Sequence, residues 1–217
     1  MYKYINMCLY TLYMENFNII DLVYTNKNSI SRELCNDMIN LFEQEERRYA
    51  GITAYGLNKN IKDTTDFIIT NGGTRWNKIN KVLSKELNNN VIEYIKKYNN
   101  IFHSNYHIFN TKYLSFDSMQ LQKYEKNVGK FNYHEDFICD FTDRKIRKLT
   151  FLWYLNDVEE GGETEFWSKY SIKPEAGKLV LFPADWTFPH TGKVPISNDK
   201  YIITGWLWQH YDTPMNI

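Results

Sequence analysis

The spacing of apolar residues changes near residue 115, and the two parts of the chain predict different secondary structure. Before that point, apolar residues recur every three or four positions in two segments, which is the pattern of amphipathic helices. We expect one helix from about Ser31 to Arg48 and another from Trp76 to Ile95, whose lysines fall on the opposite side. The apolar stripe of the first helix is formed by Leu34, Cys35, Met38, Leu41 and Phe42.

A β pattern occupies much of the remaining chain. A loose alternation from Lys62 to Ile69 predicts a strand between the two helices. After residue 115, apolar and β-branched runs of strand length are separated by turn signals such as Asn127-Val128-Gly129 and Gly161-Gly162. Such strands indicate a sandwich or jelly roll, and helices packed on one of its sheets give an α+β fold. One expected strand begins at Met119, and three more span Lys148–Leu155, Lys178–Phe182 and Lys200–Tyr211.

Length and composition fit one globular domain. The chain has 217 residues, so we expect a single domain over 1–217, with a helical support region at about 1–110 and a jelly-roll core at 115–211. The 26 basic and 26 acidic residues cancel, which disfavours nucleic acid or anionic lipid as a partner. Cys8, Cys35 and Cys139 are too few and too scattered for a disulfide framework, and we expect them to be reduced.

No segment has the pattern of a membrane span. The most apolar early stretch, Ile5 to Met14, covers only about 10 residues, whereas a span requires around 20. It also lacks a convincing small-residue cleavage site, so we do not expect a secretory signal. These patterns favour a soluble, intracellular protein without membrane contact. They do not determine its compartment, its source or its oligomeric state.

Candidate chemistry begins in the run Tyr133-His134-Glu135-Asp136-Phe137. In an extended backbone, residues i and i+2 project to the same side, so His134 and Asp136 can converge on one point. An imidazole and a carboxylate supply two of the three ligands in the facial triad that holds non-haem Fe(II). Taken alone, the pair is more typical of a surface turn that carries a hydrogen-bonded histidine.

A third ligand has to come from elsewhere in the chain. His190 follows the strand that ends at Phe182, where an inward side chain could meet the first pair. Ten residues later, Lys200 opens the final strand. If it is buried, this lysine supplies a fixed cation for a carboxylate ligand, and if it is exposed it is an ordinary solvated side chain. Spacing leaves both interpretations open.

Together these residues resemble a known family. The order Tyr124, His134-x-Asp136, Gly161-Gly162-Glu163-Thr164, His190 and Lys200 is similar to that of the Fe(II)- and 2-oxoglutarate-dependent dioxygenases of the prolyl 4-hydroxylase type. The run LTFLWYLNDVEEGGETEF, from Leu149 to Phe166, closely resembles that family's stretch YLNDVEEGGET-F. The resemblance is strong over residues 115–210 and is limited to helix–strand–helix order over residues 30–110. It implies a double-stranded β-helix, the cupin-like form of the jelly roll.

The resemblance also implies roles for the matching residues. His134, Asp136 and His190 would be the metal ligands for Fe(II). Lys200 would pair with the distal carboxylate of 2-oxoglutarate, and the hydroxyl of Tyr124 would help to hold this co-substrate. In the family, O2 is consumed, succinate and CO2 are released, and an unactivated C–H bond is hydroxylated, with ascorbate as a reductant.

Further residues are expected to line the same pocket. Thr164 would give the co-substrate a second hydrogen bond. Alternation along the last strand places Thr204 and Trp206 on the same face as Lys200, which makes them secondary candidates for the pocket. Trp206 is equally consistent with plain core packing. Hydrophobic walls that keep water out are expected from Phe151, Trp153, Leu181 and Trp206.

Other titratable residues are expected to be structural. His103 and His107 have no acidic partner at ligand spacing, and His210 lies near the end of the last strand. The Glu159-Glu160 pair falls in a turn, where adjacent side chains diverge.

The favoured substrate is a prolyl residue in a protein or peptide, because the motifs match the prolyl 4-hydroxylase branch. Relatives also oxidise lysyl residues, free amino acids and other small molecules, so these substrates stay open. Nucleobase demethylation is disfavoured because no basic stripe is present. A catalytically silent, cupin-like binding module is the alternative outside the enzymes. The loops expected around the pocket mouth are Asn58–Gly73, with Thr64, Thr65 and Asp66, and Phe137–Arg147.

Overall fold

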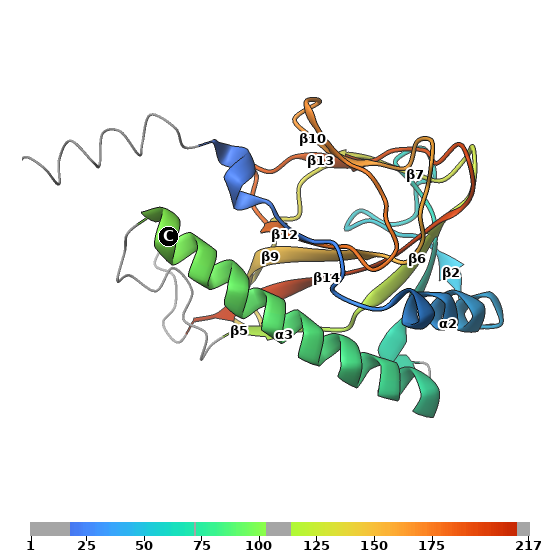
Figure 1. Cartoon of the computed structure of the whole chain (residues 1–217), viewed down its shortest axis with the longest axis horizontal. Coiled ribbons are helices and arrows are strands. Elements are labelled where there is room, and N and C mark those ends of the chain that lie inside the picture. The colour runs from blue at the N-terminus through green and yellow to red at the C-terminus, as the bar shows by residue number, and fades with distance from the viewer. Residues whose placement is uncertain (1–17, 72, 103–113, 212–217) are drawn as a thin grey trace, which may run out of the picture.

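Two antiparallel sheets form the framework of the computed structural model, which describes residues 18–71, 73–102 and 114–211 (Figure 1). Its elements are η1 (Ile19–Leu22), β1 (Tyr24–Asn26), α2 (Arg32–Glu43), β2 (Tyr49–Ala50), β3 (Lys62–Asp63), β4 (Thr65–Ile68), η2 (Ile69–Asn71), α3 (Thr74–Phe102), β5 (Leu114–Phe116), β6 (Gln120–Tyr124), β7 (Lys130–His134), β8 (Cys139–Asp140), β9 (Lys145–Tyr154), β10 (Thr164–Phe166), β11 (Tyr170–Ile172), β12 (Leu179–Pro183), β13 (His190–Gly192) and β14 (Lys200–His210). The larger sheet has the order β1-β12-β9-β14-β6-β4-β2, with β5 on β14 and β8 on β9, and the smaller has the order β11-β10-β13-β7-β3.

Helix α2 begins where the sequence predicts and ends earlier. The Ser31 side chain caps it by accepting a 3.1 Å hydrogen bond from the backbone N–H of Leu34, which satisfies one of the free donors of the first turn. The expectation that the helix reaches Arg48 is wrong, because it ends at Glu43. From Gln44 onward the predicted segment has no apolar side chain that could bury against the sheet. The fully buried residues of α2 are Cys35, Met38 and Phe42.

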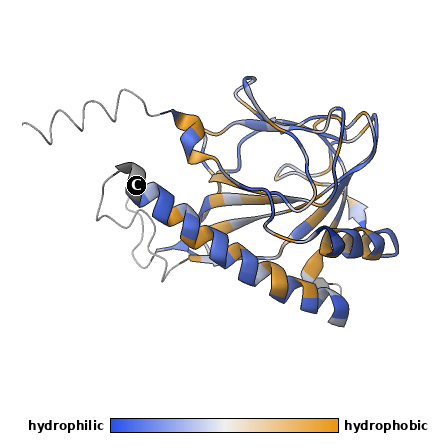
Figure 2. Cartoon of the chain, in the orientation of Figure 1, coloured by the Kyte–Doolittle hydropathy of each residue, from blue (hydrophilic) through white to orange (hydrophobic). Residues whose placement is uncertain are grey.

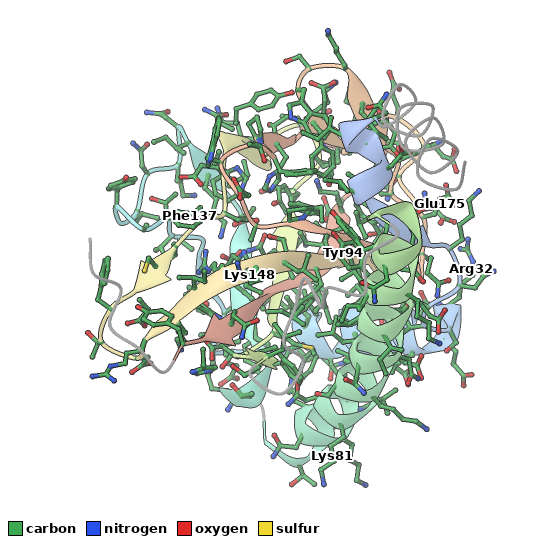
Figure 3. All side chains as sticks on the ribbon, turned by 90° about the vertical axis from the view of Figure 1, so that its left-hand side faces the viewer. Arg32, Lys81, Tyr94, Phe137, Lys148 and Glu175 are labelled. Carbon is green, nitrogen blue, oxygen red and sulfur yellow. The ribbon has the colours of Figure 1, made fainter. Side chains whose placement is uncertain are left out.

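Helix α3 confirms the second predicted helix and extends beyond it at both ends. Figure 2 shows alternating apolar and polar patches along both helices. The apolar side of each helix packs on the larger sheet, and Figure 3 shows Tyr94 on the side of α3 that faces the strands. The expectation that both helices pack on one sheet is therefore confirmed. The resulting core includes Met38 and Phe42 from α2, Leu83, Leu87 and Tyr94 from α3, and Leu121, Phe151 and Ile203 from the sheet.

The segment expected as one strand, Lys62 to Ile69, forms two strands in different sheets. In β3, Lys62 lies opposite Phe131 of β7, whereas in β4, Thr65 lies opposite Lys123 of β6. The chain therefore passes from the smaller sheet to the larger one at Thr64. Alternation along the sequence correctly indicates β structure, but it carries no information about a change of partner strand.

The two faces of the larger sheet carry different side chains. Phe151 and Trp153 of β9 and Leu181 of β12 belong to the core beneath the helices. The expectation that these three residues wall the pocket is therefore wrong. Successive strand residues point to opposite faces, so their neighbours Leu152 and Phe182 line the cavity between the sheets instead.

Strand β14 holds the two halves of the larger sheet together. It pairs with β6 on one side and with β9 on the other, although these strands lie far apart in the sequence. The smaller sheet closes over the opposite face (Figure 1). This arrangement is the α+β jelly roll that the sequence predicts. None of the helices in the described part of the chain is long and apolar enough to cross a bilayer.

Two adjacent residues of α3 test how much its buried side contributes to stability. Leu83 is fully buried, whereas Val82 is 47% exposed. We expect Leu83→Ala to lower the free energy of unfolding by about 2–5 kcal/mol, because it leaves a cavity in the core. Val82→Ala should change it by less than about 0.5 kcal/mol. Urea unfolding measures both values, and equal losses would contradict the packing of α3 described above.

Candidate active site

Three side chains predicted as metal ligands converge between the sheets. His134 ends β7, His190 begins β13, and the two residues lie directly opposite each other in the strand pair. Asp136 follows two residues after His134, so its carboxylate reaches both rings. Its Oδ1 lies 3.8 Å from His134 Nε2, and its Oδ2 lies 3.6 Å from His190 Nε2. The potential ligand atoms all lie within 4.8 Å of one another.

Backbone carbonyls orient both imidazoles. His134 Nδ1 lies 2.8 Å from the carbonyl oxygen of Asn132, and His190 Nδ1 lies 3.1 Å from that of Phe188. A carbonyl oxygen only accepts, so each Nδ1 carries the proton and each Nε2 directs a lone pair toward Asp136. This support of the outer ring nitrogen is the arrangement that metal-binding histidines use. The ring of Phe131 stacks on His134 at a centroid distance of 3.5 Å.

Electrostatics favour a neutral imidazole beside an ionised carboxylate. Burial opposes the charged form of Asp136, but His190, His134 and the hydroxyl of Thr150 outweigh it and lower the pKa of this carboxyl. Burial, together with the neighbouring His190, lowers the pKa of His134. A neutral imidazole and a carboxylate are the forms that bind a metal. Two such nitrogens and one carboxylate fit the facial triad of non-haem Fe(II).

Two residues around Asp136 were missed by the sequence analysis. Thr150 donates a 2.7 Å hydrogen bond to Asp136 Oδ2, and Arg147 Nη1 donates to the Asp136 backbone oxygen at 3.3 Å. The Arg147 guanidinium also stacks on the ring of Trp206, 3.5 Å from its centroid. Alternation along β9 places Thr150 on the face of Leu152 and could have revealed it. Arg147 lies beyond a shift in the register between β9 and β14, so simple alternation would have placed it on the other face.

The triad opens into a cavity of about 680 Å³ that also contains Lys200. The Lys200 side chain is only 1% exposed, and its Nζ donates a 3.0 Å hydrogen bond to the carbonyl oxygen of Gly162. The same Nζ lies 3.8 Å from the centroid of the Tyr124 ring. No carboxylate in the described part of the chain lies within ion-pair distance of Lys200 Nζ. Lys200 is therefore the buried lysine of the two interpretations that spacing left open.

Four further residues predicted for the pocket also line this cavity, namely Tyr124, Thr164, Thr204 and Trp206. The hydroxyls of Tyr154 and Thr164 lie 2.7 Å apart, and the Tyr154 hydroxyl also lies 3.3 Å from the carbonyl oxygen of Ile172. Thr204 instead donates to the backbone oxygen of Phe151 at 2.9 Å.

The strand segment considered for substrate contact is largely internal. Asp66 is fully buried and pairs with Lys62 at 2.7 Å, and Thr64 donates to the other Asp66 oxygen at 2.7 Å. Lys62 lines the cavity, whereas Thr64, Thr65 and Asp66 do not.

The cavity mouth is formed by three segments. Phe137 and Ile138 belong to one expected loop and Ile61 to the other. The segment 52–55, which also lines the mouth, was missed because it carries no motif. Figure 3 shows Phe137 on the side of the molecule opposite Lys81 of α3.

Of the other three histidines, only His210 lies in the described part of the chain. His210 Nε2 lies 2.8 Å from Ser115 Oγ on the neighbouring strand β5, which agrees with a structural role. His103, His107 and Cys8 lie outside the described residues. Cys35 and Cys139 are both free thiols, as expected.

Comparisons of the sequence point to one class of protein. Residues 119–208 match the model of the 2OG-Fe(II) oxygenase superfamily. The chain is 30% identical over 125 residues to probable prolyl 4-hydroxylase 10 of Arabidopsis thaliana, covering 43% of each protein. It is 28% identical over 120 residues to probable prolyl 4-hydroxylase 7 of the same plant, covering 42% of this chain and 38% of that protein. The match therefore spans less than half the length of these curated relatives.

Solved structures share the fold. The viral collagen prolyl hydroxylase of Paramecium bursaria Chlorella virus-1 in complex with 2OG has a TM-score of 0.60 at 20% identity, covering 87% of this chain and 96% of that chain. A prolyl hydroxylase from Trichoplax adhaerens, in complex with a hypoxia-inducible factor peptide fragment, has a TM-score of 0.65 at 21% identity, covering 87% and 84%. A Pseudomonas putida prolyl-4-hydroxylase has a TM-score of 0.60 at 16% identity, covering 87% and 95%.

Fold, site and family model agree on the class. Residues 119–208, which contain the triad, Tyr124 and Lys200, match the model of the 2OG-Fe(II) oxygenase superfamily. Within that class, the chain is similar to prolyl 4-hydroxylases in sequence and in fold. Fe(II) and 2-oxoglutarate, the cofactors after which the superfamily is named, are also those that the donor set and the buried lysine fit.

Thr150 tests whether the support of Asp136 matters for metal binding. Thr150→Val keeps the shape of the side chain but removes the hydrogen bond to Oδ2, so we expect metal affinity to fall by about 10- to 100-fold. Thr204→Val makes the same change in the same cavity, at a hydroxyl that bonds to backbone, and should leave metal affinity unchanged. Competition with a metal-sensitive dye measures both constants. Equal affinities in the two variants would contradict the role given to Thr150.

Proposed function

We propose that this protein is an Fe(II)- and 2-oxoglutarate-dependent dioxygenase that hydroxylates a prolyl residue in a protein or peptide and releases succinate and CO2. The observation that carries the proposal is one cavity that holds both the His134, Asp136 and His190 triad and Lys200, a buried cation that has no carboxylate partner among the described residues. Burying a charged ammonium group is unfavourable unless the charge is paired. The arrangement therefore suits a ligand that brings a carboxylate to Lys200 while its other end lies near the triad.

Each residue of the site has a place in this proposal. His134, Asp136 and His190 would hold Fe(II), which with 2-oxoglutarate and O2 supplies the oxidative chemistry. Lys200 would bind the distal carboxylate of the co-substrate. Tyr124 would orient the co-substrate through its hydroxyl, and the hydroxyl of Thr164 would add a hydrogen bond.

The remaining cavity residues suit a role in positioning and in excluding water. Thr204 and Trp206 would line the wall next to the co-substrate, and Leu152 and Phe182 supply apolar surface in place of the three residues expected from the sequence. A dry wall protects a reactive centre from side reactions with water.

A protein or peptide substrate is supported by the relatives and by the shape of the site. The Trichoplax adhaerens enzyme, which shares this fold, was solved with a peptide fragment. The mouth of the cavity presents large exposed side chains, including Tyr55 and Phe137, which suit contact with a polypeptide. The prolyl residue is inferred from the prolyl 4-hydroxylase relatives. Lysyl residues, free amino acids and other small molecules are the alternative substrates, and a silent binding module is the alternative without catalysis.

Turnover on a peptide array tests the reaction and the substrate together. With Fe(II), ascorbate, O2 and 2-oxoglutarate, we expect proline-containing peptides to gain the mass of one oxygen atom, with succinate formed in equal amount. His134→Ala should abolish both signals because it removes a ligand. Oxygen gain on another class of substrate would disprove the proline assignment. Absence of succinate from every reaction would instead indicate a binding module.

The ionisation of Lys200 predicts how co-substrate affinity depends on pH. Burial lowers the pKa of Lys200 to about 7, and nearby Glu163 partly opposes this shift. The cation that a carboxylate needs is therefore present below about pH 7 and is lost as the pH rises through that value. We expect the Kd of 2-oxoglutarate, measured by calorimetry on metal-loaded protein, to increase by up to about tenfold per pH unit above pH 7.

Lys200→Arg is the matched control for this pH dependence. A guanidinium stays ionised over the whole range, so its binding curve should be flat between about pH 6 and 9. A flat curve for the unmodified protein would contradict the pairing of Lys200 with the co-substrate.

A further inference from the structure

Four side chains form a continuous hydrogen-bonded row along the larger sheet, which we call the amide row: Tyr124, Gln122, Gln120 and Tyr49. Tyr124 Oη donates to Gln122 Oε1 at 3.2 Å. Gln122 Nε2 then donates to Gln120 Oε1 at 2.7 Å, and Gln120 Nε2 donates to Tyr49 Oη at 2.8 Å. The first three residues alternate along β6, so they share one face of the strand, and all three line the cavity.

The amide row connects the proposed co-substrate site with the edge of the sheet. Tyr124 lies opposite Lys200 in the strand pair, and its ring contacts the Lys200 ammonium. Tyr49 lies on β2, the last strand of that sheet. Tyr124 and Gln122 are only 3% and 4% exposed. At such burial, a donor or acceptor left without a partner costs about 1–3 kcal/mol.

The direction of the hydrogen bonds in the amide row determines what Tyr124 can offer to a ligand at Lys200. A phenol hydroxyl has one proton, and here Tyr124 directs it to Gln122. The oxygen of Tyr124 therefore offers only lone pairs to the cavity. A carboxylate also offers only acceptors, so it gains a hydrogen bond from Tyr124 only if that proton turns away from Gln122.

Every member of the amide row is both a donor and an acceptor, so the row can be satisfied in either direction. If the amide of Gln122 turns over, its Nε2 donates to Tyr124 Oη. Gln120 then turns over as well, and its Oε1 accepts from the hydroxyl of Tyr49. All four groups keep their partners, and the proton of Tyr124 becomes available to the cavity.

We infer that Gln122 is a positioning residue, whose amide reverses the amide row when 2-oxoglutarate binds and thereby lets Tyr124 donate a hydrogen bond to the co-substrate carboxylate. This inference rests on the proposed function. A glutamate at position 122 accepts but, when ionised, cannot donate, so it would hold the proton of Tyr124 in place. A methionine there would leave that proton free.

Binding of 2-oxoglutarate to protein loaded with Zn(II) in place of iron tests this role without turnover. We expect Gln122→Glu to raise the Kd by about tenfold or more, because a hydrogen bond to a charged group is lost. Gln122→Met should stay within about threefold of the unmodified protein, since it leaves the Tyr124 proton free. Gln44→Glu makes the same change at the exposed C-cap of α2 and should have no effect.

The same substitution in Tyr124→Phe protein distinguishes an effect of the Tyr124 hydroxyl on binding from simple charge repulsion by the new glutamate. In Tyr124→Phe protein, Gln122→Glu should no longer weaken binding, because the proton that it holds is gone. A loss of the same size in both backgrounds would overturn the inference. Thermal unfolding of each variant verifies that it folds, and the methionine variant remains informative if the glutamate variant does not fold.

The reversal itself has a spectroscopic signature. Addition of 2-oxoglutarate to the Zn(II)-loaded protein should shift the side-chain amide resonances of Gln122 and also those of Gln120, whose hydrogen bonds in the amide row go to Gln122 and Tyr49. In Gln122→Met protein the response of Gln120 should disappear. A co-substrate that binds but leaves Gln120 unmoved overturns the inference alone. A protein that binds Zn(II) but no 2-oxoglutarate overturns the proposed function, and the inference with it.

Discussion

The pairing of β7 with β13 is the constraint on which the site depends. It places His134 directly opposite His190, with ring centroids 4.3 Å apart, and so brings together two imidazoles that are 56 positions apart in the chain. Asp136 then reaches both rings because it follows His134 by two residues. The same pair places Gly192 against Tyr124, where an added Cβ would lie 3.1 Å from Cε1 of the ring. The strand pair that positions the triad thus also contacts the proposed co-substrate pocket, whose Lys200 and Tyr124 lie on β14 and β6.

The two faces of the larger sheet have different roles, because one supports the fold and the other carries the residues of the site. One face is apolar and is covered by α2 and α3, so the strands are held by a large dry core. The other face carries Lys200, Tyr124 and the two glutamines of the amide row, all within one cavity. Burying polar groups on this face is unfavourable unless each finds a partner. The amide row and the contact of Lys200 with the Gly162 carbonyl supply such partners, while the charge of Lys200 stays available for a ligand.

Much of the fold follows from local patterns. The stripe around Met38 and Phe42 and the longer stripe of α3 predicted both helices, and the run that became β14 has the β-branched and aromatic residues of a buried strand. The helix ends were predicted less well. Helix α2 stops at Glu43, where the last apolar residues of the predicted segment lie, and not at Arg48. The site residues were found through a resemblance of motifs, since neither His-x-Asp nor a single lysine is specific by itself. The amide row and the contacts of Thr150 carry no sequence signal.

The sequence by itself determined the periodicities, and with them the type of each element and the set of residues that share a face. Tertiary structure decided which face became core and which became cavity. Phe151, Trp153 and Leu181 illustrate this, because alternation groups them correctly but cannot say that the helices cover their side. The division of the segment at Thr64 between two sheets has the same origin. Strand pairing is set by contacts between distant segments, and a local pattern contains no information about its partner.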